Sequence, residues 1–127
     1  MSLENKNLLI VEGKDILGSL PQFVKQYFNA NVIGSEYVPV DWADILFRQR
    51  IHAALVHARL SSELDSLLAG IKTGLPMVVL VNSLMREDIS RIEIIKKTGV
   101  KTIDKQEVVG GEDLYYSALS YLSEITK

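Results

Sequence analysis

The chain has 127 residues, of which 47% are hydrophobic and 24% are charged, and it contains no cysteine. This balance is typical of one globular domain with a single core and excludes disordered, disulfide-stapled and membrane-spanning classes, because no apolar run approaches the ~20 residues that cross a bilayer. The formal net charge is −2 and the basic residues are scattered, so a nucleic-acid partner is not expected.

The first six residues are considered apart from the rest of the chain, because they precede the first apolar run. Residues 1–6 lack the basic and then apolar layout of a signal peptide, so we expect a cytoplasmic protein with no membrane partner. We expect residues 1–6 to be disordered or left over from cloning, and residues 7–127 to form the domain.

Short apolar runs recur along the chain, with helical stretches between them. Their apolar residues are continuous rather than alternating, which predicts strands that are covered on both faces. The last run is shorter and more polar, which is typical of an edge strand. The predicted strands are residues 8–11, 31–33, 53–56, 77–81 and 100–103.

Between these runs the apolar period changes to that of a helix, most clearly over residues 64–71 and 114–125. Asp41 predicts the start of a helix that reaches about Arg50, and Asp88 predicts the start of one that ends at residues 98–99. Pro21 interrupts the apolar pattern of the first helix, so this helix either kinks there or starts near Ser19.

The order of the elements indicates the fold class. A strand followed by a helix, repeated five times with short connections, predicts a mostly parallel sheet with helices on both faces. No linker or internal repeat interrupts this order. A doubly wound α/β sheet of this kind binds ligands beyond the carboxyl ends of its strands, so the residues at these ends are the candidates for function.

Four predicted strands run directly into polar residues. The segments are Leu8-Leu9-Ile10-Val11-Glu12-Gly13, Ala54-Leu55-Val56-His57, Pro76-Met77-Val78-Val79-Leu80-Val81-Asn82-Ser83 and Val100-Lys101-Thr102-Ile103-Asp104-Lys105-Gln106. This layout resembles that of response-regulator receiver (CheY-like) domains, and the resemblance covers the chain from about Asn7 to Ile125. It implies a flavodoxin-like (βα)5 three-layer sandwich with a five-stranded parallel sheet in the order 2-1-3-4-5.

In the receiver family the first strand ends in an acidic pair and the third ends in the phosphorylated aspartate. Carried onto this chain, the resemblance keeps one carboxylate of the pair as Glu12 and replaces the other by Gly13. The position of the phosphoacceptor is taken by His57. The chain therefore resembles a degenerate receiver, or pseudo-receiver, that lacks the aspartate.

The fourth strand of a receiver ends in Thr or Ser, and the fifth ends in a lysine that proline usually follows. Here Val81 takes the hydroxyl position and Asn82 follows it, so a hydroxyl is supplied only if Ser83 substitutes through a shift in register. The lysine is kept as Lys105, but Gln106 replaces the proline.

These replacements bear on the chemistry of phosphorylation, which needs a carboxylate nucleophile and a magnesium ion held by oxygen ligands. Glu12 is the one acid kept, and an imidazole and a valine offer too few hard ligands for that ion. We therefore expect no metal, no cofactor and no catalytic residue, and an ion pair between Glu12 and Lys105 in place of the metal. The expected function is that of a two-component signalling module, not an enzyme, which acts by contact with a sensor kinase, an output domain or another signalling protein.

Several alternatives stay open on the sequence. His57 is a candidate for nitrogen phosphorylation, for a base or for a metal ligand, although a packed and hydrogen-bonded histidine is the commoner case. A divergent receiver would use a carboxylate such as Asp104 or Glu63 as its phosphoacceptor. A flavodoxin-like domain would bind a nucleotide or similar small molecule in the same crevice, but no glycine-rich phosphate loop follows the first strand.

The last predicted helix carries three tyrosines beside its apolar stripe, and at least one of them should be exposed. Receivers commonly dimerise or bind partners through their last two helices, and aromatic residues are enriched in the cores of interfaces. We therefore expect Tyr115, Tyr116 and Tyr121 to be candidates for a homodimer or partner interface.

Overall fold

The computed structural model describes residues 3–107 and 111–126. Five parallel strands form one sheet in the order β2-β1-β3-β4-β5, which confirms the predicted topology. In chain order the elements are β1 (Asn7–Val11), α1 (Lys14–Phe28), β2 (Asn31–Ser35), α2 (Trp42–Gln49), β3 (Ile51–His57), α3 (Leu60–Lys72), β4 (Met77–Val81), the short 3-10 helix η1 (Arg86–Asp88), α4 (Ile89–Lys97), β5 (Lys101–Asp104) and α5 (Gly111–Ile125).

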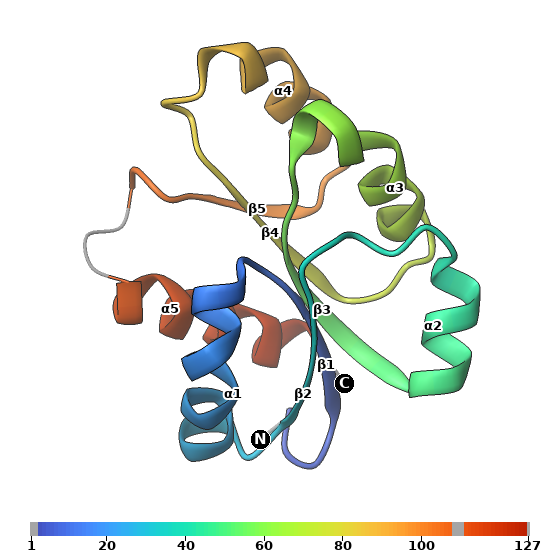
Figure 1. Ribbon diagram of the computed structural model, residues 1–127, viewed down its shortest axis with the longest axis vertical. Coiled ribbons are helices and arrows are strands. Elements are labelled where there is room, and N and C mark those ends of the chain that lie inside the picture. The colour runs from blue at the N-terminus through green and yellow to red at the C-terminus, as the bar shows by residue number, and fades with distance from the viewer. Residues whose placement is uncertain (1–2, 108–110, 127) are drawn as a thin grey trace.

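Helices cover both faces of the sheet, so the domain has three layers (Figure 1). Helices α1 and α5 pack on one face, where Leu8, Ile10 and Leu55 point, and α2, α3 and α4 pack on the other face, where Leu9 and Val11 point. The central strands are buried on both sides because alternate residues enter opposite cores. Continuous apolar runs in the sequence are therefore explained by the position of these strands in the sheet.

The observed helix ends agree with those predicted from the sequence, with two differences. The Asp41 carboxylate accepts a hydrogen bond from the amide of Asp44 at 3.1 Å and begins α2, as predicted. Helix α1 starts at Lys14 rather than near Ser19, and Pro21 lies inside it. Its first turn is stabilised because Ile16 and Leu17 pack on the core, which outweighs the hydrogen bond that proline lacks.

The second difference concerns Asp88, which precedes α4 but makes no capping hydrogen bond. Its carboxylate instead accepts from the guanidinium of Arg91 at 3.1 Å. At the N-terminal end of α4, Asp88 therefore forms an ion pair with Arg91 in place of a capping hydrogen bond.

The domain also begins earlier than expected. Leu3 is fully buried in the core beside α1 and α5, and the amide of Asn5 donates to the carbonyl of Asn29 at 2.8 Å. Residues 3–6 thus pack as part of the domain, whereas residues 1 and 2 lie outside the described residues. Within the described ranges, no helix combines the length and apolarity that crossing a membrane requires.

Candidate functional site

The residues at the carboxyl ends of the strands meet at one edge of the sheet. Glu12 follows β1, His57 is the last residue of β3, and Lys105 follows β5. Parallel strands end at the same edge, which explains why positions as far apart as 12 and 105 come together. The predicted cluster of Glu12, His57 and Lys105 is present as a connected polar network.

Glu12 is the centre of this network and is 5% exposed. Its Oε1 accepts from the Gly13 amide at 2.9 Å and contacts His57 Nδ1 at 2.8 Å, while its Oε2 accepts from the Tyr115 hydroxyl at 2.5 Å. Burial on its own would raise the pKa of Glu12, but the hydrogen bonds from His57, Tyr115 and Gly13 outweigh it and lower the pKa to about 2. The carboxylate is therefore ionised at neutral pH.

The carboxylate of Glu12 and the ammonium of Lys105 both lie against the same ring nitrogen of His57. His57 Nδ1 lies 2.8 Å from Glu12 Oε1 and 3.0 Å from Lys105 Nζ, yet one ring nitrogen can serve only one of these as a hydrogen-bond partner. The carboxylate can only accept and the ammonium can only donate, and we assign the proton to Nδ1 because the contact with Glu12 is the shorter of the two. Lys105 is then held as the ion-pair partner of Glu12, with Nζ 3.6 Å from Oε2.

Tyr115 is a member of the network that sequence reasoning missed. It was expected at an interface, but its side chain is buried, with 7% exposed, and its hydroxyl bonds to Glu12. Burial and this hydrogen bond raise the pKa of Tyr115 well above its usual range, so the hydroxyl remains a donor. The inward spacing of Leu114, Tyr115 and Ala118 was the available signal for burial, but no pattern pointed to Glu12 as its partner.

The fourth strand offers no hydroxyl to the network. Val81 ends β4 opposite Asp104 and is buried, so the strand has no shift in register that would bring Ser83 to its place. Ser83 is exposed, and its amide donates to Asp104 Oδ1 at 3.2 Å. Asn82 Oδ1 accepts from the amide of Leu84 and so shapes the loop after β4.

The two carboxylates considered as alternative phosphoacceptors are engaged elsewhere. Glu63 accepts from the amides of Val38 and Arg59, at 2.7 and 2.8 Å, and so holds two loops to α3. Burial on its own would raise the pKa of Asp104, but hydrogen bonds from Ser83 and Gln106 outweigh it and lower this pKa. Both side chains act in the structure as acceptors for backbone amides.

The residues at this edge do not fit a magnesium ion. Both oxygens of Glu12 already bind donors, and Gly13 contributes no side chain where the receiver pattern has its second acid. Residues 3–107 and 111–126 contain no group of three histidine, cysteine, aspartate or glutamate side chains that could hold a metal ion. The negative charge of Glu12 is instead paired with the ammonium of Lys105.

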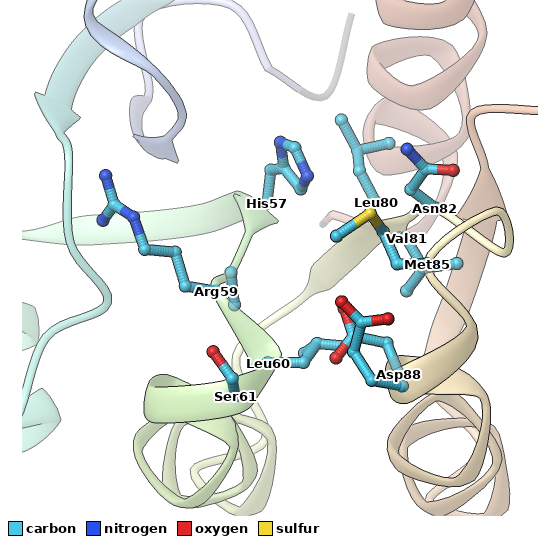
Figure 2. A pocket seen from close by; sticks show the side chains of 11 residues that line it. His57, Arg59, Leu60, Ser61, Leu80, Val81, Asn82, Met85 and Asp88 are labelled. Atoms are coloured by element: carbon cyan, nitrogen blue, oxygen red, sulfur yellow. The ribbon is translucent and has the colours of Figure 1, made fainter.

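A cavity of about 360 Å³ opens beside His57, between the ends of β3 and β4 and the helices α3 and α4. Figure 2 shows His57, Asn82 and Asp88 around it, with Met85 and Leu60 among its apolar walls. A second, smaller cavity of about 150 Å³ lies on the Glu12 side of the imidazole. His57 thus separates the polar network from a space large enough for a small ligand.

The three tyrosines of α5 have different surroundings. Tyr116 is 49% exposed and contacts the rings of Tyr27 and Phe28, and the ring of Tyr121 lies under the ammonium of Lys101. With Tyr115 inside the core, the interface expectation concerns Tyr116 and Tyr121.

Comparisons with known proteins identify the fold. No protein-family model and no curated protein matches the sequence. A signal receiver domain from Vibrio parahaemolyticus matches with a TM-score of 0.62 and 12% identity, over 94% of this chain and 91% of that one. The N-terminal signal receiver domain of a response regulator from Bacteroides fragilis matches with a TM-score of 0.61 and 17% identity, over 94% and 97%.

A structure of an adenylate cyclase from Rhodopirellula baltica also matches, with a TM-score of 0.60 and 12% identity, over 97% of this chain and 92% of that one. At these identities the likeness concerns the fold. Together with the observed strand order, it gives this chain the receiver, or CheY-like, fold.

Proposed function

We propose that this protein is a receiver-like signalling module of the two-component type that acts through protein contacts, without phosphorylation of an aspartate. The observation that carries the proposal is His57 at the end of β3, the position that the receiver resemblance gives to the phosphoacceptor. Its Nδ1 is bonded to Glu12, and Lys105 is paired with the same carboxylate. The groups that would handle a phosphoryl group are thus bound to one another.

The chemistry of the site supports this reading. An aspartyl phosphate forms when a carboxylate oxygen attacks phosphorus while a divalent cation neutralises the phosphate oxygens. Glu12 is buried behind three hydrogen bonds, so its oxygens are neither exposed nor free to bind such a cation. Val81 at the end of β4 has no hydroxyl that could report a modification.

The partner in this proposal is another protein, such as a sensor kinase, an output domain or a second copy of the chain. Exposed apolar side chains on each of the last two helices support this part of the proposal: Ile94 of α4 is 45% exposed, and Tyr116 of α5 is 49% exposed beside α1. We also propose that the protein is not an enzyme and works in the cytoplasm. Both of these statements are based on the resemblance to receivers.

The test is to incubate the protein with magnesium and a small phosphodonor such as phosphoramidate, and to measure its intact mass. We expect no phosphoryl group on the wild-type chain. Stable incorporation at any residue of the pocket would refute the proposal.

A matched variant makes the test sharper. The double substitution Gly13→Asp and His57→Asp restores the acidic pair and the phosphoacceptor while keeping Lys105. Gly13 is exposed, has extended backbone angles and leaves open space for a side chain, so aspartate fits there without strain. This variant should gain one phosphoryl group under conditions that leave the wild type unchanged.

A further inference from the structure

The cavity between α3 and α4 has features that the proposed function does not use. Its volume of about 360 Å³ lies within the range of small-molecule sites, which is about 300 to 1,000 Å³. Its walls are apolar, since Leu60, Leu80, Val81 and Met85 line it. Ligand sites of this kind combine apolar walls with a few polar groups that fix the orientation of the ligand.

The polar side chains that line the cavity include two carboxylates, which can only accept hydrogen bonds, beside those of His57, Arg59, Ser61 and Asn82. The contacts of His57 to Glu12 and Lys105 both involve Nδ1, so Nε2 is the ring nitrogen that is left to face a ligand. Asp88 contributes a carboxylate on the side of the cavity away from His57 (Figure 2). Glu87 also belongs to the lining. Arg91 donates to Oδ1 of Asp88 at 3.1 Å, so a cationic ligand would share this carboxylate with Arg91.

Each positive charge near the cavity already has a partner, and the guanidinium of Arg91 is paired with the Asp88 carboxylate at the cavity wall itself. Arg59 belongs to the lining, but its guanidinium donates to the carbonyl of Glu36 at 3.0 Å and lies over the ring of Tyr37, 4.8 Å from its centre. Figure 2 shows this side chain extending away from Asn82 and Met85. Lys105 faces the other ring nitrogen of His57 and the carboxylate of Glu12.

We propose that this cavity binds a small organic cation, an amidinium, guanidinium or ammonium group attached to an apolar body. The cationic end donates to the carboxylate of Asp88 and to His57 Nε2, and the apolar body packs on Leu60, Val81 and Met85. Charge-assisted hydrogen bonds of this kind are the strong ones, and here they form in a partly enclosed site. The two carboxylates of the lining distinguish the site from a phosphate pocket, because they would repel an anionic ligand.

Three isosteric probes test the sign of the site directly. Benzamidine is a cation, benzamide is neutral and benzoate is an anion, and all three have the same ring and nearly the same shape. Each is titrated into the uniformly 15N-labelled protein while the backbone amides of Asn82, Met85 and Asp88 are followed by NMR. We expect saturable shifts with benzamidine and no saturable shift with benzoate. The affinity for benzamide should be at least about tenfold lower than that for benzamidine.

Variants locate the binding charge. Asp88→Asn should weaken benzamidine binding about tenfold, and Glu87→Gln, at an exposed residue whose replacement leaves the fold intact, should weaken it to a smaller extent. The control is Glu93→Gln, which removes an exposed carboxylate of α4 outside the cavity and should leave the affinity unchanged. The NMR spectrum of each variant reports its folding in the same experiment.

A capped Leu-Arg-Leu peptide distinguishes a free cation from an arginine side chain of another protein. The peptide would also shift the amides of Leu84 and Ile89, which are 71% and 50% exposed and adjoin the lining residues Met85 and Asp88 in the sequence. Tighter binding of the peptide assigns the site to a protein side chain, and tighter binding of benzamidine assigns it to a free cation. Preference for benzoate or inorganic phosphate, equal binding of all three probes, or the absence of saturable shifts would overturn the proposal without bearing on phosphorylation.

Discussion

The buried carboxylate of Glu12 should make the stability of the fold depend on pH. Its pKa is lowered from 4.5 to about 2 by donors that exist only in the folded state. Because the folded pKa lies below the unfolded one, the stabilisation is complete above about pH 5 and is lost as the pH falls through 2. A shift of this size corresponds to about 3 kcal/mol of stability at neutral pH.

The substitution Glu12→Gln removes the titrating group and keeps the shape of the side chain. From pH 7 to pH 3, linkage predicts that the wild type loses about 2 kcal/mol through this residue, whereas the variant loses none of it. The variant should therefore be less stable than the wild type at pH 7, by about 3 kcal/mol, and the gap should narrow to about 1 kcal/mol at pH 3.

Urea unfolding at several pH values measures this difference. Trp42 is the one tryptophan of the chain and is 3% exposed, so its fluorescence reports the loss of the core. Glu93→Gln, at an exposed position on α4, serves as the control and should follow the wild type at every pH. If Glu12→Gln and the wild type lost stability in parallel between pH 7 and pH 3, the network around Glu12 would be misassigned.

Three further predictions follow from particular contacts. Tyr115→Phe removes a donor to an ionised carboxylate and should cost about 2 kcal/mol of stability, whereas Tyr116→Phe at the exposed neighbour should change it by less than about 0.5 kcal/mol in the same urea assay. Gly70→Ala places a Cβ against the ring of Trp42 and should lower the free energy of unfolding by about 1 to 3 kcal/mol. Gly18→Ala meets open space on α1 and should raise the free energy of unfolding by about 0.5 to 1 kcal/mol. Equal effects of the two substitutions in thermal unfolding would contradict the packing described. Replacing Tyr116 and Tyr121 with serine should shift the sedimentation profile toward the monomer if the last two helices form an interface, and an unchanged profile would count against that interface.

The sheet was predictable because its signal is local in the sequence. Strands β1, β3 and β4 are buried on both faces, so their apolar runs are continuous. Once the strands and their parallel order were assigned, Glu12, His57 and Lys105 had to lie at one edge, since parallel strands end together. The centre of the site thus followed from topology, without knowledge of any side-chain contact.

The parts that were missed depend on contacts between distant segments. Tyr115 meets Glu12 across 103 positions of sequence, and whether a tyrosine of α5 faces the strand ends or solvent depends on how the helix is rotated on the sheet. The sequence left two alternatives for the first helix, a kink at Pro21 or a start near Ser19, and the structure excludes the second, because α1 starts at Lys14 and its first turn packs on the core. Such packing energy is not visible in a local pattern. The cavity beside His57 arises from the spacing of α3 and α4, on which the sequence is silent.

The state of the His57 ring tests the central claim most directly, because the network replaces phosphate chemistry only if Glu12 holds this imidazole. Long-range 1H–15N NMR of the ring at neutral pH, recorded before and after adding magnesium and phosphoramidate, should show a proton on Nδ1 and no change with either addition. An unprotonated Nδ1, or new ring signals coupled to phosphorus, would contradict the account.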